Sequence, residues 1–360
     1  MVDGEACGEF SRRGFLRSVA VASATVPLAT GAVLAQSAAD GHSAHSGRDE
    51  GSNTVVGEVD YAKNGFDPHA ILTDWDKGAV STNADGRIVR EWTITAVDHE
   101  FEVAPGVKFA GWTYNGRVPG PTLRCTEGEW LRIKFQNGST HPHSMHFHGI
   151  HAARMDGVPG AGLVDPGGEF TYEFEAKPFG CHLYHCHAVP LKRHIHKGLY
   201  GAFIVDPDPL RHPEARDKAA ARLLGSPENA RWQELLMVMN GFDTNFDDEN
   251  EFYAVNSIPF AYFNKPIRID KTRPVRIYLI NITEFDPINS LHLHAHFYDF
   301  YDHGTTLDPT NRMIDTIMMC QAQRGILEFS FENHEPGLYM FHAHQSEFAE
   351  LGWMSHFEVV

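Results

Sequence analysis

The stretch Gly180-Cys181-His182-Leu183-Tyr184-His185-Cys186-His187 places one cysteine between two histidines. On an extended strand, neighbouring side chains point to opposite faces. Cys186 is therefore expected to face one way, and His185 and His187 the other. A soft thiolate suits copper, while imidazoles can bind other metal ions on their own side. The motif predicts a thiolate-bound copper joined by short covalent paths to a second metal centre, which is suited to moving electrons one at a time.

The same stretch recurs later in the chain. Residues 337–344, Gly-Leu-Tyr-Met-Phe-His-Ala-His, match residues 180–187 without gaps, and Asn-Ser-Leu-His-Leu-His at 289–294 matches His-Ser-Met-His-Phe-His at 143–148. This spacing indicates two homologous halves. Ala343 and Asn289 stand in the second half where Cys186 and His143 stand in the first. Only the first half can therefore build a thiolate site, although both halves can supply imidazoles.

Short alternating apolar runs surround these motifs in both halves. They are rich in Val, Ile, Phe, Tyr and Trp, and turn residues separate them, which is typical of an all-β sandwich. The predicted strands are 89–96, 109–114, 130–135, 170–175 and 201–205, then 234–239, 267–269, 275–280, 325–331, 337–341 and 354–359. The predicted parts are a leader at 1–35, an extension at 36–86, a first domain at 87–207, a partly helical linker at 208–231 and a second domain at 232–360.

The bulk composition narrows the class of protein. The chain has 360 residues, a net charge of −17 and 23 histidines. The negative charge argues against nucleic acid and against an anionic membrane as partners, and no stretch after the leader predicts a membrane span. Five cysteines are present, without the spacing of a zinc finger. A disulfide among Cys125, Cys181 and Cys320 is left open.

The N-terminus resembles a twin-arginine export signal. Ser11-Arg12-Arg13-Gly14-Phe15-Leu16-Arg17 precedes a mildly apolar run, and a cleavage site is expected after Ala35. This predicts a periplasmic or secreted protein that is exported already folded. Two histidines of the polar tail that follows, His42 and His45, are expected to be solvated rather than to bind metal.

A blue copper site needs two histidines, one cysteine and a weak or absent axial ligand. Cys186 and His143 are the first two ligands. His194 and His196 compete for the third position, and we choose His194 because it lies five residues before Leu199. Leu199 has no donor atom at the expected axial position. We therefore expect three-coordinate copper with a raised reduction potential.

The two halves together supply a second set of imidazoles. Eight histidines suit three copper ions, and three coppers with one remote copper can store the four electrons that reduce dioxygen to two waters. These histidines are His146, His148, His185, His187, His292, His294, His342 and His344.

With these motifs in hand, the sequence resembles the multicopper oxidases, and within them the two-domain, laccase-like enzymes with the type 1 copper in the first domain. The resemblance runs from about Arg87 to the C-terminus. Its motifs are Asn115-Gly-Arg-Val-Pro-Gly-Pro-Thr-Leu123, His146-Phe-His-Gly149, Met155-Asp-Gly157 and the His-Cys-His loop. It implies two cupredoxin-like Greek-key β-sandwich domains, four coppers per chain, and a homotrimer with each three-copper cluster between subunits.

The resemblance also implies roles for single residues. His146 and His292 would hold the type 2 copper, and the other six cluster histidines the type 3 pair. Asp156 matches an acidic residue that assists proton delivery near the cluster. Glu347, three residues past His344, is a second proton-relay candidate. The loop from Cys186 to His194 is longer than in laccases and nearer that of copper nitrite reductases.

Three functions compete. The first is an oxidase that takes electrons from phenols, aromatic amines or low-valent metal ions and passes them to dioxygen. The second is a copper nitrite reductase, whose single catalytic copper needs only three histidines and leaves His187 without a role. The third is a non-catalytic periplasmic copper-binding protein. The physiological electron donor is not legible in the sequence. Met313, Met318 and Met319 lie close together in the sequence. We expect these methionines to pack in the core rather than to capture Cu(I).

Overall fold

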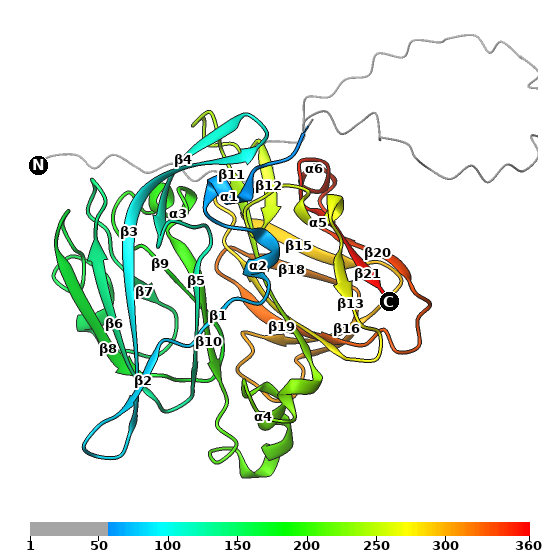
Figure 1. Cartoon of the computed structure of the whole chain (residues 1–360), viewed down its shortest axis with the longest axis horizontal. Coiled ribbons are helices and arrows are strands. Elements are labelled where there is room, and N and C mark those ends of the chain that lie inside the picture. Colours follow the sequence, from blue (N-terminus) through cyan, green and yellow to red (C-terminus); the bar gives the residue numbers. More distant parts are fainter. Residues whose placement is uncertain (1–56) are drawn as a thin grey trace, which may run out of the picture. The chain divides into compact units, whose positions relative to one another are not determined.

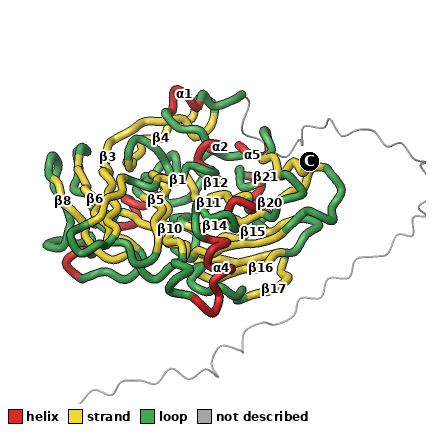
Figure 2. The backbone as a smooth tube through the Cα atoms, turned by 60° about the horizontal axis from the view of Figure 1, so that its bottom comes forward, coloured by secondary structure: helices red, strands yellow, loops and turns green. Residues whose placement is uncertain are grey.

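The computed structural model describes residues 57–360. The predicted leader, its cleavage site, His42 and His45 lie outside the described residues. Figure 1 shows strands dominating the described chain, with the first-domain and second-domain strands gathered into separate sets. Figure 2 shows the same strands in yellow, with helices limited to short segments.

Two sheets form the first domain. One runs in the order β1-β5-β10-β9-β7, and the other in the order β2-β3-β6-β8, with β4 paired to β3. Their bounds are β1 Trp75–Asp76, β2 Ala79–Thr82, β3 Ile88–Ala104, β4 Val107–Tyr114, β5 Gly120–Thr126, β6 Trp130–Asn137, β7 His146–Phe147, β8 Glu169–Glu175, β9 Gly180–His185 and β10 Tyr200–Asp206. The helices of this part are α1 Tyr61–Asn64, α2 Pro68–Ile71 and α3 Leu191–His196, with one 3₁₀ turn at Ala153–Met155.

Two sheets also form the second domain, in the orders β12-β11-β14-β19-β16-β17 and β13-β21-β20-β15-β18. The strands are β11 Gln233–Phe242, β12 Phe252–Val255, β13 Ile267–Ile269, β14 Val275–Asn281, β15 Ile288–Leu293, β16 Tyr298–Asp302, β17 Asn311–Ile314, β18 Thr316–Cys320, β19 Arg324–Phe329, β20 Gly337–His342 and β21 Met354–Val359. The helices are α4 Arg216–Arg222 in the linker, α5 Ala261–Asn264 and α6 Ser346–Glu350, with 3₁₀ turns at Pro213–Ala215 and Asn229–Arg231. The all-β class and the two cupredoxin domains predicted from the sequence are confirmed.

Pairing reaches further toward the N-terminus than the predicted start of the first domain at Arg87. β1 pairs in parallel with β5, and β2 pairs antiparallel with β3. Residues 75–82 are therefore built into the sheets of the first domain. The division of the chain into leader, extension, domains and linker stays a prediction.

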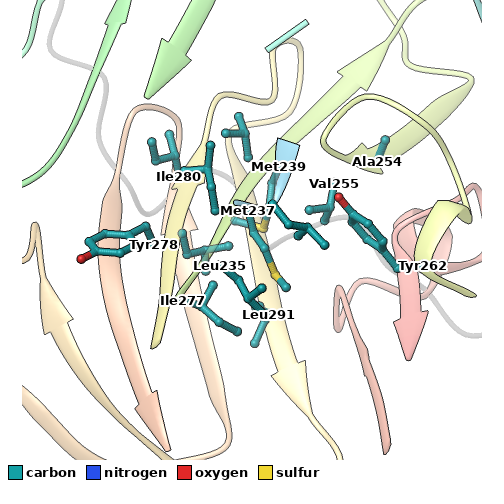
Figure 3. Close-up of a cluster of buried hydrophobic side chains, with 14 of the residues drawn as sticks. Leu235, Met237, Met239, Ala254, Val255, Tyr262, Ile277, Tyr278, Ile280 and Leu291 are labelled. Atoms are coloured by element: carbon teal, nitrogen blue, oxygen red, sulfur yellow. The ribbon is translucent and has the colours of Figure 1, made fainter. Parts of the chain in front are cut away.

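Alternating apolar residues explain both cores. In β6 the side chains of Leu131, Ile133 and Phe135 are fully buried, while the residues between them are less so. Figure 3 shows the core of the second domain, where Met237 and Met239 of β11 lie among Ile277, Ile280 and Leu291. Burial of such side chains stabilises each sandwich by roughly 1.5–3 kcal/mol per residue.

The two domains are joined by direct backbone contacts as well as by the linker. The N–H of Cys181 in β9 donates to the carbonyl of His303 at 2.9 Å, and Arg324 Nε donates to the carbonyl of Cys181 at 3.2 Å. β9 is buried along its whole length. The second domain therefore helps to hold β9, the strand that leads into the His-Cys-His motif, in its place in the first-domain sheet.

Candidate metal centres

Cys186, His143 and His194 converge from three separate segments. Cys186 follows β9, His143 lies in the loop before β7, and His194 lies in α3. The Sγ atom of Cys186 is 3.3 Å from His194 Nδ1 and 3.8 Å from His143 Nδ1, and the two Nδ1 atoms are 3.1 Å apart. All three side chains are buried. The structure thus brings together the three residues predicted for the type 1 site.

His196 lies outside the group formed by Cys186, His143 and His194. Its Nε2 accepts a hydrogen bond from the backbone N–H of Asp243 in the second domain at 3.0 Å. Because two residues along α3 correspond to a rotation of about 200° around the helix axis, His194 turns toward Cys186 and His196 turns toward the other domain. The geometry favours His194 as the third ligand.

Backbone groups shape the pocket around the sulfur. The N–H groups of Ser144 and Ala188 point at Sγ from 3.4 and 3.5 Å, and the N–H of Cys186 donates to the carbonyl of Leu199 at 2.9 Å. Trp112 packs against both imidazoles, with ring centroids 5.1 Å from His143 and 4.8 Å from His194. The donor set is rigid because its members are held by packing and by backbone hydrogen bonds.

Burial sets the protonation of these groups. It lowers the pKa of His143 to about 3, with a further contribution from His194, and it lowers the pKa of His194 to about 4. Burial raises the pKa of the Cys186 thiol, although N–H groups of Ala188 and Ser144 partly offset this. The imidazoles are thus neutral ligands at neutral pH, and the thiolate needs a cation beside it. A soft thiolate with two neutral imidazoles fits copper.

A second group of histidines lies on the other side of the strand end. His148 Nε2 is 3.2 Å from His185 Nε2, and the ring of His146 is 5.1 Å from the rings of both His185 and His187. The alternation around Cys186 therefore separates one thiolate site from one imidazole group, as the sequence predicts.

The second domain builds the equivalent group. His294 Nε2 is 2.9 Å from His342 Nε2, and the ring of His292 is 5.3 Å from that of His344. Hydrogen bonds repeat as well as positions. His185 Nδ1 meets the carbonyl of Cys186 at 2.9 Å, and His342 Nδ1 meets the carbonyl of Ala343 at 2.5 Å.

Serine hydroxyls repeat in the same way. Ser144 Oγ accepts from the N–H of His187 at 3.0 Å, and Ser290 Oγ accepts from the N–H of His344 at 2.8 Å. A histidine whose Nδ1–H donates to a carbonyl keeps its Nε2 lone pair free for a metal.

The second domain has no cysteine at the counterpart of the thiolate site. Ala343 replaces the cysteine, and its N–H donates to the carbonyl of Trp353 at 3.1 Å, as Cys186 does to Leu199. Trp353 is fully buried, and its indole N–H donates to the carbonyl of Ser290 at 3.1 Å. The second domain thus keeps the backbone contacts of this loop but offers no thiolate, in agreement with the inference that only the first half can hold a thiolate-bound metal.

The two imidazole groups remain separate within one chain. Among residues 57–360, the groups of three close ligands draw their histidines from one domain at a time: His146, His148 and His185, or His292, His294 and His342. His294 and His344 are exposed, and the first residues of β20 are exposed where those of β9 are buried. The second-domain histidines are thus less covered by their own chain than the first-domain histidines.

One acidic residue lies beside the first histidine of each group. Asp156 lies with Oδ1 3.2 Å from His146 Nδ1, and its carbonyl is 2.8 Å from the same atom. The carbonyl of Asp315 is 3.0 Å from His292 Nδ1, and its carboxylate is 4.0 Å away. The sequence analysis missed Asp315, although its place before β18 mirrors that of Asp156 before Gly157.

Glu347 and His151 differ in how they relate to the histidines. Glu347 is an exposed residue of α6, and among the described residues its carboxylate makes no ion pair with a cluster histidine. His151, which the sequence analysis did not single out, has Nε2 3.9 Å from Asp156 Oδ1 and lies beside His146. Asp156 is therefore the better placed of the two predicted carboxylates.

The four cysteines of residues 57–360 do not form disulfides with one another. Cys125, Cys181 and Cys186 are buried free thiols, and Cys320 is an exposed one. Within the described residues, no helix has the length and apolar character that crossing a bilayer requires.

Comparisons with known proteins match both domains. Residues 96–209 and residues 232–360 each match a family model described as "Multicopper oxidase". A solved structure described as "Crystal structure of multicopper oxidase" is 52% identical, with a TM-score of 0.76 over 84% of this chain and 100% of that one. The copper nitrite reductase of Nitrosomonas europaea is 25% identical, with a TM-score of 0.63 over 76% of this chain and 94% of that one.

Curated relatives match over a smaller part. The copper-containing nitrite reductase of Neisseria meningitidis is 35% identical over 113 residues, which are 31% of this chain and 29% of that protein. The match thus spans less than a third of the length of these curated relatives.

Proposed function

The chain belongs to the multicopper oxidase family and binds copper, and from this premise we propose that it oxidises reducing substrates one electron at a time and reduces dioxygen to water. The observation that carries the proposal is the placement of Cys186 between His185 and His187. The cysteine side chain belongs to one donor set, and the two histidines belong to another. Copper bound there would supply one-electron transfer at the Cys186 site and four-electron storage at the histidine groups.

The residues would divide the work as follows. Cys186, His143 and His194 would hold the type 1 copper, while His146 and His292 would hold the type 2 copper. The six remaining cluster histidines would hold the type 3 pair, giving four coppers per chain. The peptide links from Cys186 to its neighbours offer the shortest covalent path between the two donor sets. Asp156, in contact with His146, would pass protons toward the cluster.

Exposure of the second-domain histidines supports an assembly in which another copy completes the site. A cluster of three coppers needs both imidazole groups, and one chain does not join them. We propose that the first-domain group of one subunit meets the second-domain group of the next, closing a homotrimer. His294 and His344 are exposed in the single chain, which leaves them open to such a partner.

We propose the electron donor only as a class of substrate. It would be a phenol, an aromatic amine or a low-valent metal ion, oxidised in a laccase-like reaction. The twin-arginine leader supports a periplasmic or secreted location. Replacement of Arg12 and Arg13 by lysine should keep the protein in the cytoplasm, which cell fractionation would measure.

Copper nitrite reductase is the second candidate, because proteins with that name match parts of this chain in sequence and in structure. His187 and His344 argue against it, since both lie with their groups at matched positions and a single catalytic copper needs only three histidines. The third candidate is copper binding without turnover.

One set of measurements separates the three candidates. Copper content per chain, oxygen uptake with phenols or Cu(I), and nitrite reduction would be measured on the same preparation. The proposal predicts four coppers, four substrate electrons per dioxygen and no released peroxide. Nitrite reduction with two coppers per chain would favour the second candidate, and four coppers without oxygen uptake would favour the third.

A further inference from the structure

A short chain of hydrogen bonds leads from the type 1 site to the protein surface. His143 Nε2 lies 2.9 Å from Ser139 Oγ, and Ser139 Oγ donates to Asp98 Oδ1 at 2.5 Å. His143 and Ser139 are buried, whereas Asp98 is exposed on β3. Ser139 thus connects His143, a predicted type 1 ligand, to a surface carboxylate.

The carboxylate fixes the direction of every bond in this chain. Asp98 can only accept, so the hydroxyl proton of Ser139 points to Asp98, and the lone pair of Ser139 faces His143. His143 must then carry its proton on Nε2 and donate to Ser139. Its Nδ1 lone pair is left facing Cys186 Sγ and His194 Nδ1.

Asp98 is held in place and kept charged. It accepts from the Thr140 hydroxyl at 2.8 Å and from the Thr140 N–H at 3.3 Å. Burial alone would raise the pKa of Asp98, but these hydrogen bonds and the one from Ser139 bring the pKa below its usual value. The end of the chain is therefore a carboxylate at neutral pH.

We propose that Asp98 and Ser139 are positioning residues that preset the tautomer of His143 and increase its electron donation to the type 1 copper. This rests on the type 1 site of the proposed function. A ligand histidine that donates its other N–H toward a carboxylate is oriented and made more basic. Stronger donation stabilises oxidised copper, so the chain lowers the reduction potential of the site.

The second domain supports this assignment as an internal comparison. The N–H of Gly138 donates to the carbonyl of Ala96, and the N–H of Ile282 donates to the carbonyl of Met239, both at 2.9 Å. Ala96 therefore corresponds to Met239, and Asp98, two residues on, corresponds to Gly241.

The hydroxyl is kept in the second domain, since Thr283 Oγ1 accepts from Asn289 Nδ2 at 2.9 Å. Thr283 and Asn289 stand where Ser139 and His143 stand in the first domain. The domain that lacks the thiolate site thus also lacks the carboxylate, while the fold around it is conserved between the halves.

The test uses four single variants of the full chain, Asp98→Asn, Ser139→Ala, Ser139→Thr and Glu100→Gln, and the double variant that combines Asp98→Asn with Ser139→Ala. Glu100 is the matched control because it is an exposed carboxylate on the same strand, paired with Lys108 rather than with the site. The reduction potential of the type 1 copper is measured by mediated titration, together with its electron paramagnetic resonance spectrum. In the copper-free protein, nitrogen NMR reports the tautomer of His143.

Asp98→Asn and Ser139→Ala should both raise the potential, so that the Cu(I) to Cu(II) ratio at a fixed applied potential increases several-fold. The double variant should shift no further than the larger single shift, because the two residues act through one chain. Ser139→Thr and Glu100→Gln should stay close to the unaltered protein. The copper-free protein should hold His143 with its proton on Nε2, and Ser139→Ala should weaken that preference.

Three results would overturn the inference: Glu100→Gln shifting the potential as far as Asp98→Asn, additive shifts in the double variant, or His143 protonated on Nδ1 in the copper-free protein. Failure of the proposed function looks different. If the unaltered protein has no blue copper absorption band, the proposed function is wrong. The NMR measurement on the copper-free protein would still determine the tautomer of His143. A blue protein whose variants keep its potential would defeat this inference alone.

Discussion

Arg124 of the first domain donates from Nη1 to Glu234 of the second at 2.8 Å, and their side chains are 1% and 6% exposed. Arg124 also binds Asp206, and Glu234 also binds Arg276. With Arg222 and Glu328, the network holds three arginines and three carboxylates. Such a balanced set leaves no unpaired charge at the buried junction between the domains, and it holds them in one orientation.

Replacing Arg124 with alanine should lower the free energy of unfolding by about 3–5 kcal/mol, because Glu234 and Asp206 would remain buried without their shared partner. Denaturant unfolding of the copper-free protein measures the change. Arg132→Ala is the control, since Arg132 pairs with Glu173 and Glu91 on an exposed face and should cost no more than about 1 kcal/mol. Equal losses in the two variants would contradict the role given to the junction.

Cys186→Ser should abolish the blue colour and turnover together, because the thiolate is removed from the type 1 donor set. The copper content should fall from four to three per chain, since the cluster histidines are untouched. Visible absorption, metal analysis and oxygen uptake check this. Cys320→Ser, at an exposed free thiol, should leave all three readouts unchanged. A variant at 186 that stays blue would place the copper elsewhere.

Co-assembly of two inactive variants tests the proposed trimer. His146→Ala damages the first-domain group and His292→Ala damages the second-domain group, so each protein alone should be inactive. Unfolded together and refolded as mixed trimers, they should regain part of the activity, because some interfaces combine two intact groups. Oxygen uptake of the mixture reports the result. Mixed trimers without any recovery would mean that both groups of one cluster come from a single chain.

Acid should destabilise the copper-free protein through buried neutral histidines. Burial lowers the pKa of His196 from 6.5 to about 4. Between these values the unfolded chain binds a proton that the folded chain does not, so stability is complete above about pH 6.5 and is lost as the pH falls through about 4.

His196→Gln should remove one such contribution, worth up to about 3 kcal/mol at low pH. Unfolding free energies measured between pH 7 and pH 4 should therefore show a shallower slope in the variant. His303, whose side chain is only partly covered and lies beside Asp302, gives the comparison through His303→Gln. Parallel slopes for all three proteins would contradict the assignment.

Asp156→Asn should slow turnover at least tenfold, in keeping with the effect of a proton-transferring group, while the copper content is retained. Glu347→Gln should have a smaller effect, since the exposed carboxylate of Glu347 makes no ion pair with a cluster histidine among the described residues. Steady-state oxygen uptake against pH, with metal analysis, compares the two. A larger loss in Glu347→Gln would reverse the order of the two proton-relay candidates.

The sequence was most informative where chemistry and spacing coincide. Alternation on a strand placed Cys186 and His185 on different faces. The internal repeat placed His294 and His342 at the positions of His148 and His185, and the two pairs of rings meet in the same way. β6 and β13 begin where the alternating pattern predicts. Such features depend on local periodicity, which is written directly in the chain.

Features that depend on tertiary packing were not predictable in this way. In the sequence, Asp315 and Asp98 are indistinguishable from ordinary surface carboxylates. Only the fold shows that Asp315 lies beside His292 and that Asp98 accepts a hydrogen bond from Ser139. β5 carries a glycine, a proline and the buried Arg124, so its composition resembles a loop more than a strand. The choice between His194 and His196 also needed the direction of α3.

Ala343 stands in the second domain where Cys186 stands in the first, and the fully buried Trp353 follows Gly352 as Leu199 follows Gly198. Two copies of one scaffold therefore differ in whether their matched loop carries a sulfur ligand. In the proposed enzyme, reducing equivalents would enter each subunit at one of these two loops, and their direction of travel would follow from that asymmetry.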